Sequence, residues 1–174
     1  MATDLFKLKT CKICPNLGVN HVGSSGPANA SLMIIGQSPG AEEVKECKPF
    51  VGRCGKILNK LLETAKLQRD QVYITNVLKC RPPNNRLGAA DEIRNCFVTW
   101  LQYEIEDINP QKILLLGKDA WQIFQFAPTE WQPPKIYHGL IHKTPRREYI
   151  FSYHPSYFLR RNKISEFLEI AKLL

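Results

Sequence analysis

The sequence lacks any apolar run long enough to cross a bilayer, since the longest candidate, residues 113–117, falls far short of the roughly 20 residues needed. The first ten residues carry two lysines but no apolar core, so they do not resemble a secretory signal. Internal repeats and low-complexity stretches are missing as well. These absences exclude helical membrane proteins and repeat arrays. We expect a cytoplasmic protein that makes no contact with a membrane.

Acidic residues are scarce: 16 Asp and Glu stand against 24 Lys and Arg, which gives a formal net charge of +8. This charge favours a polyanionic partner, because each neutralised phosphate releases condensed counterions. Charge alone does not separate a nucleic-acid-binding protein from a soluble protein that is merely basic. With 44% hydrophobic and 23% charged residues in 174, the composition is that of a globular protein, and we expect one domain covering residues 1–174.

Six cysteines in a reducing compartment argue against a disulfide framework and favour a metal site or free buried thiols. Four of them form two pairs, a C-x2-C pair and a pair separated by 15 residues: Cys11 with Cys14, and Cys80 with Cys96. Spacing does not separate tetrahedral zinc from a four-iron cluster, or either from unrelated buried cysteines. Cys47 and Cys54 lie outside this pattern, and we expect them to be free thiols.

Four segments rich in branched apolar residues predict β-strands at 31–35, 72–78, 112–116 and 149–153. Most are apolar on both faces, as in a parallel sheet that is covered on each side. Helical spacing of apolar residues follows each strand, at 57–65, 93–108, 120–124 and 164–171, with Glu104 as the one charged member of the second stripe. The alternation predicts an α/β fold, a three-layer α/β/α sandwich with a central, mainly parallel four-stranded sheet.

Polar residues and glycines gather where the predicted strands end. Residues 36–40 follow the first strand, Asn76 lies near the end of the second, Gly117 follows the third and residues 154–156 follow the fourth. Ligands of open parallel sheets bind in the crevice beyond the carboxyl ends of the strands. The sequence therefore predicts one site at this edge of the sheet.

Five segments together resemble the family-4 uracil-DNA glycosylases of bacteria, archaea and phages, the iron–sulfur class of the superfamily. They occur in the order of that family, and the block 74–86 with Cys96 is the most specific. The segments are Cys11 with Cys14, residues 34–40 with Glu43, residues 49–53, residues 74–86, and residues 154–156 with Leu159 and Arg160. The resemblance implies a DNA repair hydrolase that flips uracil out of DNA and hydrolyses its N-glycosidic bond, leaving an abasic site.

The resemblance also implies partners and a cofactor. The substrate would be uracil-containing DNA, single- or double-stranded, and we expect a monomer in the cytoplasm of a bacterial, archaeal or phage-infected host cell. A structural 4Fe-4S cluster would be held by the two cysteine pairs, Cys11, Cys14, Cys80 and Cys96.

The same resemblance implies roles at the base. Phe50 would stack on uracil, Asn76 would pair with O4 and N3–H, and His154 would donate a hydrogen bond to O2 as negative charge develops there. Without the motifs, Phe50 is a core residue and His154 caps the turn at Pro155. The remaining substrate-binding residues would be Gly36, Gly40, Ser156 and Arg160, and residues 157–159 (Tyr157, Phe158 and Leu159) would offer an apolar wedge.

The first motif departs from the family pattern. Gln37 stands where the family usually has a glutamate, and Ser38 stands where another class has an aspartate. Gln37 can orient a water but carries no charge, so Glu43 is the nearest matching carboxylate, and both are candidate catalytic residues. Two alternatives stay open: a glycosylase-like DNA-binding protein without catalysis, and a zinc-stabilised nucleic-acid module without a base pocket.

Overall fold

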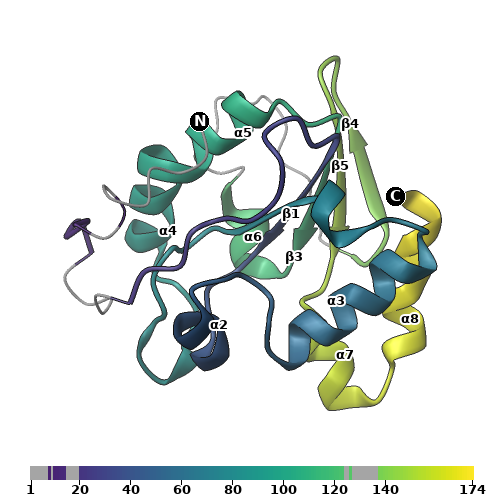
Figure 1. The fold of residues 1–174 in the computed structure, drawn as a ribbon, viewed down its shortest axis with the longest axis horizontal. Coiled ribbons are helices and arrows are strands. Elements are labelled where there is room, and N and C mark those ends of the chain that lie inside the picture. The colour runs from purple at the N-terminus through teal and green to yellow at the C-terminus, as the bar shows by residue number, and fades with distance from the viewer. Residues whose placement is uncertain (1–7, 9, 15–19, 124–125, 127–136) are drawn as a thin grey trace.

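A five-stranded sheet forms the centre of the computed structural model, which describes residues 8, 10–14, 20–123, 126 and 137–174. The parallel strands are β1 (Leu32–Gly36), β2 (Tyr73–Asn76), β3 (Lys112–Leu116) and β5 (Glu148–Ser152). The strand order is β2-β1-β3-β5-β4, and β4 (Leu140–Lys143) pairs antiparallel with β5 at one edge (Figure 1). All four predicted strands are present, with small shifts at their ends.

The predicted number of four strands was wrong, because β4 adds a fifth. Residues 140–143 alternate between partly buried and exposed positions, as expected for an edge strand with one face in solvent. Such a short strand has no continuous apolar run that a sequence pattern could reveal. The parallel core of the sheet is unaffected.

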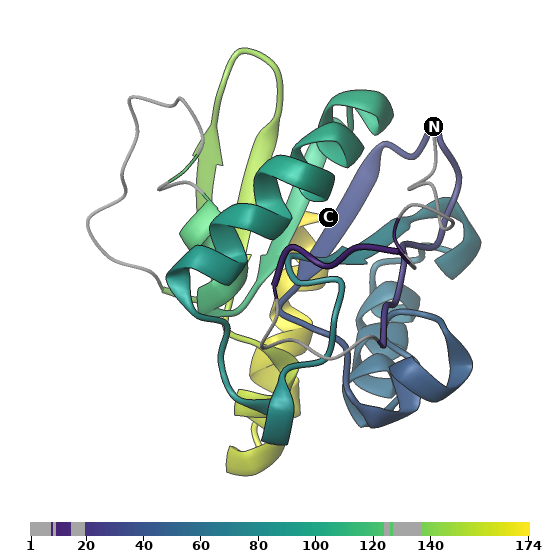
Figure 2. The same cartoon turned by 90° about the vertical axis from the view of Figure 1, so that its left-hand side faces the viewer.

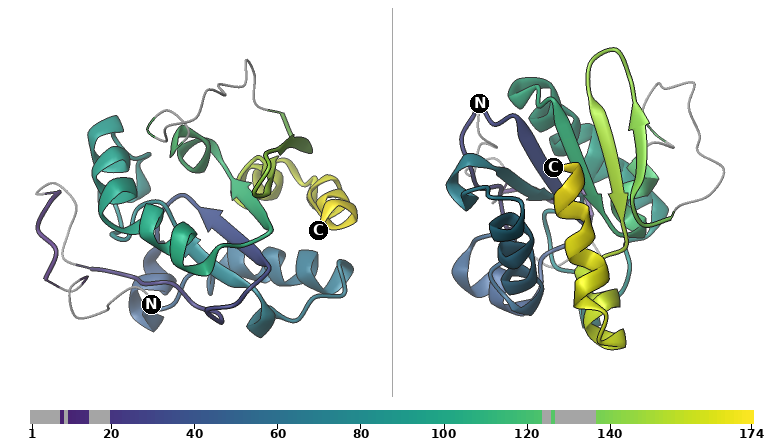
Figure 3. Two further views of the ribbon diagram at one scale, coloured as in Figure 1. Left: turned by 90° about the horizontal axis from the view of Figure 1, so that it is seen from above. Right: turned by 90° about the vertical axis from the view of Figure 1, so that its right-hand side faces the viewer.

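Helices cover both faces of the sheet, so the predicted three-layer sandwich is confirmed. One layer contains α3 (Arg53–Thr64), α7 (Pro155–Arg161) and α8 (Ile164–Leu168), which continues as a 3-10 turn at Glu169–Leu173. The other contains α4 (Ala90–Cys96), α5 (Gln102–Ile108) and α6 (Lys118–Gln122). Figures 2 and 3 show the layers from the side and from above. Alternate residues of β1 serve the two cores: Ile34 packs toward α3, while Met33 and Ile35 pack toward α4.

One helical segment runs from α4 to α5 through a π turn at Phe97–Leu101. The sequence predicted this segment as a single helix over 93–108 with one charged residue in its apolar stripe. A π turn contains one more residue than an α turn, so the faces before and after it are shifted relative to each other. Glu104 is buried, with 3% of its surface exposed, so this charged residue does lie on the buried side of the helical segment, as its place in the apolar stripe predicted.

The N-terminal part of the chain lies against β2 and the segment after it. His21 and Cys80 form an isolated antiparallel bridge, and the amide of Val22 donates to the carbonyl of Lys79 at 2.7 Å. The side chain of His21 also lies 3.2 Å from the carbonyl oxygen of Cys11. The first cysteine pair is thereby brought close to the second. Among the described helices, none combines the length and the apolar character needed to cross a membrane.

Candidate active site

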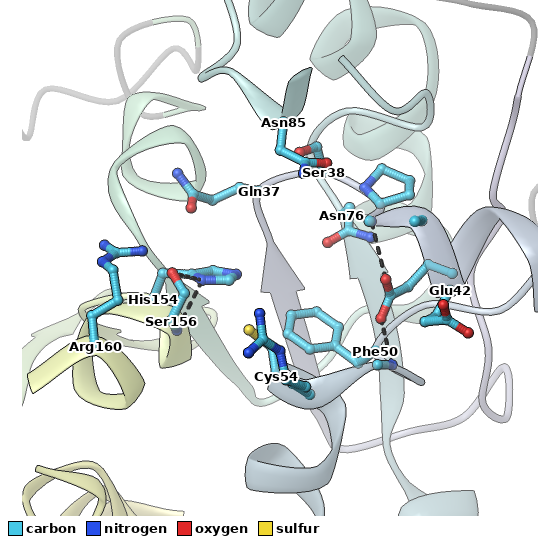
Figure 4. A pocket seen from close by; sticks show the side chains of 16 residues that line it. Gln37, Ser38, Glu42, Phe50, Cys54, Asn76, Asn85, His154, Ser156 and Arg160 are labelled. Atoms are coloured by element: carbon cyan, nitrogen blue, oxygen red, sulfur yellow. Dashed lines mark hydrogen bonds between the residues drawn. The ribbon is translucent and has the colours of Figure 1, made fainter. Parts of the chain in front are cut away.

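A cavity of about 440 Å³ opens beyond the carboxyl ends of the parallel strands. Figure 4 shows the side chains that line it. Eight of the predicted site residues are among them: Gln37, Gly40, Glu43, Phe50, Asn76, His154, Ser156 and Arg160. The structure thus brings the loops after the parallel strands together around one cavity. The cavity is lined further by residues to which the sequence assigned no role at the site, including Cys54 and Asn85.

Gly36 forms part of the floor of the site, although it does not line the cavity itself. A Cβ atom at this position would lie 2.4 Å from Oδ1 of Asn76 and 2.5 Å from Cζ of Phe50. Both contacts are far shorter than van der Waals distances. Only glycine at position 36 therefore allows the asparagine and the phenylalanine ring to approach each other.

Phe50 is buried, with 5% of its surface exposed, and has a backbone φ of +53°. A bulky residue rarely adopts this left-handed conformation, which costs about 1–2 kcal/mol. Gly55 allows it, since a Cβ at position 55 would lie 1.9 Å from the carbonyl oxygen of Phe50. Phe50 is thus a buried residue that also lines the cavity, and its stacking on uracil stays a prediction.

Glu43 and Arg69 brace the loop that carries Phe50 from two sides. Oε1 of Glu43 accepts the backbone amides of Val51 at 2.9 Å and Gly52 at 2.8 Å, and Oε2 accepts the amide of Gly40 at 3.1 Å. The guanidinium of Arg69 donates to the carbonyl of Pro49 at 2.8 Å. Three backbone amides thus occupy the carboxylate of Glu43. The sequence did not point to Arg69, because it lies outside every motif.

Asn76 ends β2 and stands in register with Gly36 of β1. Its side chain is 3% exposed and lines the cavity. No hydrogen bond joins its carboxamide to another residue in the part of the chain that the structure describes. Among the described residues no fully buried side-chain N or O atom lacks a partner, so the polar atoms of this carboxamide reach the cavity, where they are open to a ligand.

His154 is the N-cap of α7, and its ring lines the cavity. Nδ1 accepts the backbone amide of Ser156 at 3.3 Å and lies 2.9 Å from the Ser156 hydroxyl oxygen. A backbone amide only donates, so the neutral ring carries its proton on Nε2. Burial, and to a lesser degree the charge of Arg160, lowers the pKa of His154 to about 4, against a smaller opposite effect of Glu43. His154 thus caps α7 and at the same time lines the cavity, while its hydrogen bond to uracil O2 stays a prediction.

Gln37 is hydrogen-bonded to Asp119, a residue that the sequence analysis missed. Asp119 lies in α6 with 2% of its surface exposed and also accepts the amide of Gly88 at 3.0 Å. Burial raises the pKa of Asp119, while its bonds to Gly88 and Gln37 oppose this effect. Gly117 lies next to both Gln37 and His154, since a Cβ atom at position 117 would be 2.9 Å from Cδ of Gln37 and 3.0 Å from Cβ of His154.

The predicted apolar wedge is wrong for Phe158, which is 1% exposed and packs against His138 and Phe167. Tyr157 and Leu159 are partly exposed, so only these two remain available for contact with DNA. Ser156 lies in the first turn of α7 and Arg160 is exposed in its last turn. Figure 4 places both beside His154 at one side of the cavity.

The predicted ligand cysteines lie in one region. Cys14 packs against the core cluster that contains Cys80 and Cys96, and all six cysteines of the chain are free thiols. Burial is the main reason that the pKa of Cys80 and the pKa of Cys96 are raised to about 12. The charges of Cys11 and Cys14 raise both values further. Among the described residues, no three Cys, His, Asp or Glu side chains are arranged as ligands of one metal ion.

Comparison with known proteins places these features in a family. The sequence model of the uracil DNA glycosylase superfamily matches residues 24–174. The type-4 uracil-DNA glycosylase of Archaeoglobus fulgidus is 36% identical over 168 residues, covering 94% of this chain and 79% of that protein. The type-4 enzyme of Thermotoga maritima is 37% identical over 167 residues, covering 95% and 85%. A type-5 uracil-DNA glycosylase of Pyrobaculum aerophilum is 29% identical over 147 residues, covering 75% and 63%. The chain therefore belongs to the uracil DNA glycosylase superfamily and, within it, to the type-4 family.

Proposed function

We propose that the protein hydrolyses the N-glycosidic bond of uracil in DNA and leaves an abasic site. The observation that carries this proposal is the pairing of two groups across one cavity. The carboxamide of Asn76 opens onto the cavity, and His154 offers a neutral Nε2–H donor. A base inside a duplex is out of reach of both groups, so the nucleotide must be flipped into the cavity.

Recognition of the base rests on Phe50 and Asn76. The ring of Phe50 offers a flat apolar surface, and stacking on an aromatic ring is worth about 1–3 kcal/mol per base. The carboxamide of Asn76 has one donor end and one acceptor end, which match O4 and N3–H of uracil. Cytosine presents a donor and an acceptor in the opposite order, and its binding would leave buried polar groups unpaired.

Catalysis rests on stabilisation of the departing base. Breaking the glycosidic bond builds negative charge on uracil and positive charge on the sugar. The Nε2–H of His154 meets that negative charge at O2, and a donor fixed in advance by Ser156 needs no reorganisation during the reaction. The exposed guanidinium of Arg160 adds positive potential on the same side of the cavity and suits a DNA phosphate.

The two remaining candidate catalytic residues, Gln37 and Glu43, have different roles: the first contacts water and the second holds the backbone. Gln37 lies near the buried carboxylate of Asp119, and its uncharged amide can orient a water in the cavity. Glu43 accepts three backbone amides, so we assign it to positioning the loop of Phe50 rather than to activating water. The proposed role of Glu43 thus differs from the catalytic one that the motif implies.

We infer that Cys11, Cys14, Cys80 and Cys96 hold a 4Fe-4S cluster. The donor set supports this, since four thiols from two distant segments lie within range of each other's charge. The cluster, when bound, supplies a structural cross-link between the N-terminal segment and the region that follows β2. The chain keeps Cys80 and Cys96 buried and protonated, so their binding of metal releases protons.

Uracil-containing DNA, single- or double-stranded, is the partner that this site requires, and the excess of basic residues suits its phosphates. The test is single-turnover excision from single-stranded DNA with one uracil, beside equilibrium binding to the same strand. Release of uracil is expected. Binding without release would instead favour a glycosylase-like DNA-binding protein.

A further inference from the structure

Beneath Asn76 lies a buried ion pair to which the family motifs assign no role at the site. Nζ of Lys79 lies 2.7 Å from Oε2 of Glu104, and these side chains are 1% and 2% exposed. Nζ also donates to the hydroxyl of Thr75 at 2.6 Å, and that hydroxyl donates to the same carboxylate oxygen at 2.9 Å. Removing two charges from water costs free energy, so the contacts of this ion pair must supply a reason for its burial.

The third bond of the ammonium group points to that reason. Nζ of Lys79 donates to the backbone carbonyl of Asn76 at 2.9 Å. The lysine therefore fixes the peptide unit that follows Asn76, at the point where β2 ends and the carboxamide enters the cavity. Its backbone amide meanwhile donates to Sγ of Cys96 at 3.3 Å. Lys79 thus contacts both the base-reading residue and the cysteine region.

The π turn at Phe97–Leu101 makes this double contact possible. Cys96 and Glu104 are eight residues apart, and at about 100° per residue an unbroken α-helix would place them roughly 80° apart around its axis. The extra residue of the π turn removes one such step, which leaves them about 20° apart. Both side chains then face Lys79 from the same side of the helix.

We infer that Lys79, with Glu104 as its counter-ion, is the positioning residue for Asn76 in the recognition of uracil. This inference rests on the proposed function, because it assigns to Asn76 the reading of the base. It adds a residue that acts through Asn76 and touches neither the base nor the DNA. Removing the pair should misplace the carboxamide and weaken recognition, while the chemistry at His154 keeps its own contacts.

The test replaces both members, Lys79→Met with Glu104→Gln, because Lys79→Met alone would leave a buried carboxylate unpaired and could prevent folding. The glutamine oxygen still accepts from Thr75. Lys112→Met is the matched control: Nζ of Lys112 also donates to carbonyl oxygens, those of Leu173 and Leu174, but at the opposite end of the sheet. Affinity for free uracil, affinity for uracil-free DNA, iron content and single-turnover rates are measured for each protein.

The double variant should bind free uracil about tenfold more weakly, as expected when one hydrogen bond to the base is lost. Its excision rate should fall at low DNA concentration and recover largely at saturation, with iron content and affinity for uracil-free DNA unchanged. Uracil affinity within twofold of the parent, or a loss matched by Lys112→Met, would overturn this inference alone. A parent protein that neither binds nor releases uracil would overturn the proposed function together with it.

Discussion

The rings of Phe50 and His154 lie 6.3 Å apart between their centroids, with 32° between their planes. The surface proposed to stack on the base and the donor proposed to meet its developing charge are therefore neighbours. They come from segments more than a hundred residues apart, the loop before α3 and the loop before α7. Their spacing is set by backbone contacts, through Glu43 on one side and Ser156 on the other.

Replacement of His154 by Ala should lower the single-turnover excision rate by roughly a hundredfold or more, with DNA affinity largely kept. The reason is that the Nε2–H bond strengthens mainly in the transition state. Ser156→Ala removes the hydroxyl beside Nδ1 but keeps the backbone amide, so a smaller loss is expected for it. A His154 variant that loses DNA binding and keeps its rate would contradict the assigned role.

His154 should also make the protein less stable in mild acid. Its pKa is about 4 when folded and near 6.5 when unfolded, so between these values the unfolded chain binds more protons. Stability is therefore lost as the pH falls through this window. Because the ring faces the cavity and is partly solvated, we expect a contribution of about 1–2 kcal/mol between pH 7 and pH 5. Urea unfolding at both values, for the parent and for His154→Asn, measures it, and equal losses would refute it.

Asn76→Asp should abolish uracil excision and allow weak excision of cytosine. An ionised carboxylate has no donor end, so it opposes O4 of uracil and suits the amino group of cytosine. Asn76→Ala, which removes the carboxamide without adding a charge, should lose uracil binding and gain nothing with cytosine. Competition between uracil- and cytosine-containing strands measures the change. Unaltered uracil preference in the Asp variant would show that another group reads this edge.

Gln37→Glu restores the residue usual in the family, yet the structure predicts a slower enzyme. The new carboxylate would face the buried carboxylate of Asp119, and two such groups cannot both ionise without repulsion. Adding Asp119→Asn should restore a charged hydrogen bond and raise the rate above that of Gln37→Glu alone. A double-mutant cycle on single-turnover rates measures this coupling, and additive effects would exclude it.

Cys80→Ser should remove the visible absorption of the iron–sulfur cluster and destabilise the region around Cys80 and Cys96. Cys47→Ser is the control, because Cys47 is exposed and outside the cysteine region, and it should keep its iron. Iron content and absorption spectra of both variants decide the matter. A colourless parent protein that contains zinc would point to the zinc-stabilised alternative.

The sequence predicted those parts of the fold that follow from continuous apolar patterns. The parallel strands and the helices behind them are of this kind, because burial on both faces imposes an apolar residue at nearly every position. The strand β4 and the helix α2 (Ala41–Glu46) carry no such pattern, since α2 has no buried residue. The positions of the site residues followed in turn, because the topology brings the ends of parallel strands to one edge.

Contacts between distant polar residues could not be predicted in the same way. The bond between Gln37 and Asp119 and the contact of Arg69 with Pro49 join segments by side chains that any surface loop could carry. Glu104 gave a faint signal as a charge in an apolar stripe, but the lysine it pairs with lies in another motif. Phe158 looked like a wedge because its exposure depends on how α7 turns against α8, which no local pattern records.

The division of the cavity between the two halves of the chain has a consequence for how activity is acquired during synthesis. Residues 36–76 supply Phe50 and Asn76, but His154 is placed only when β5 has paired with β3, close to the C-terminus. A nascent chain that stops before residue 148 could bury much of the first core and would still hold half a site. Contacts of such long sequence separation form late and slowly. A chain that stops before residue 148 lacks His154 and, on the proposed mechanism, should not release uracil from DNA.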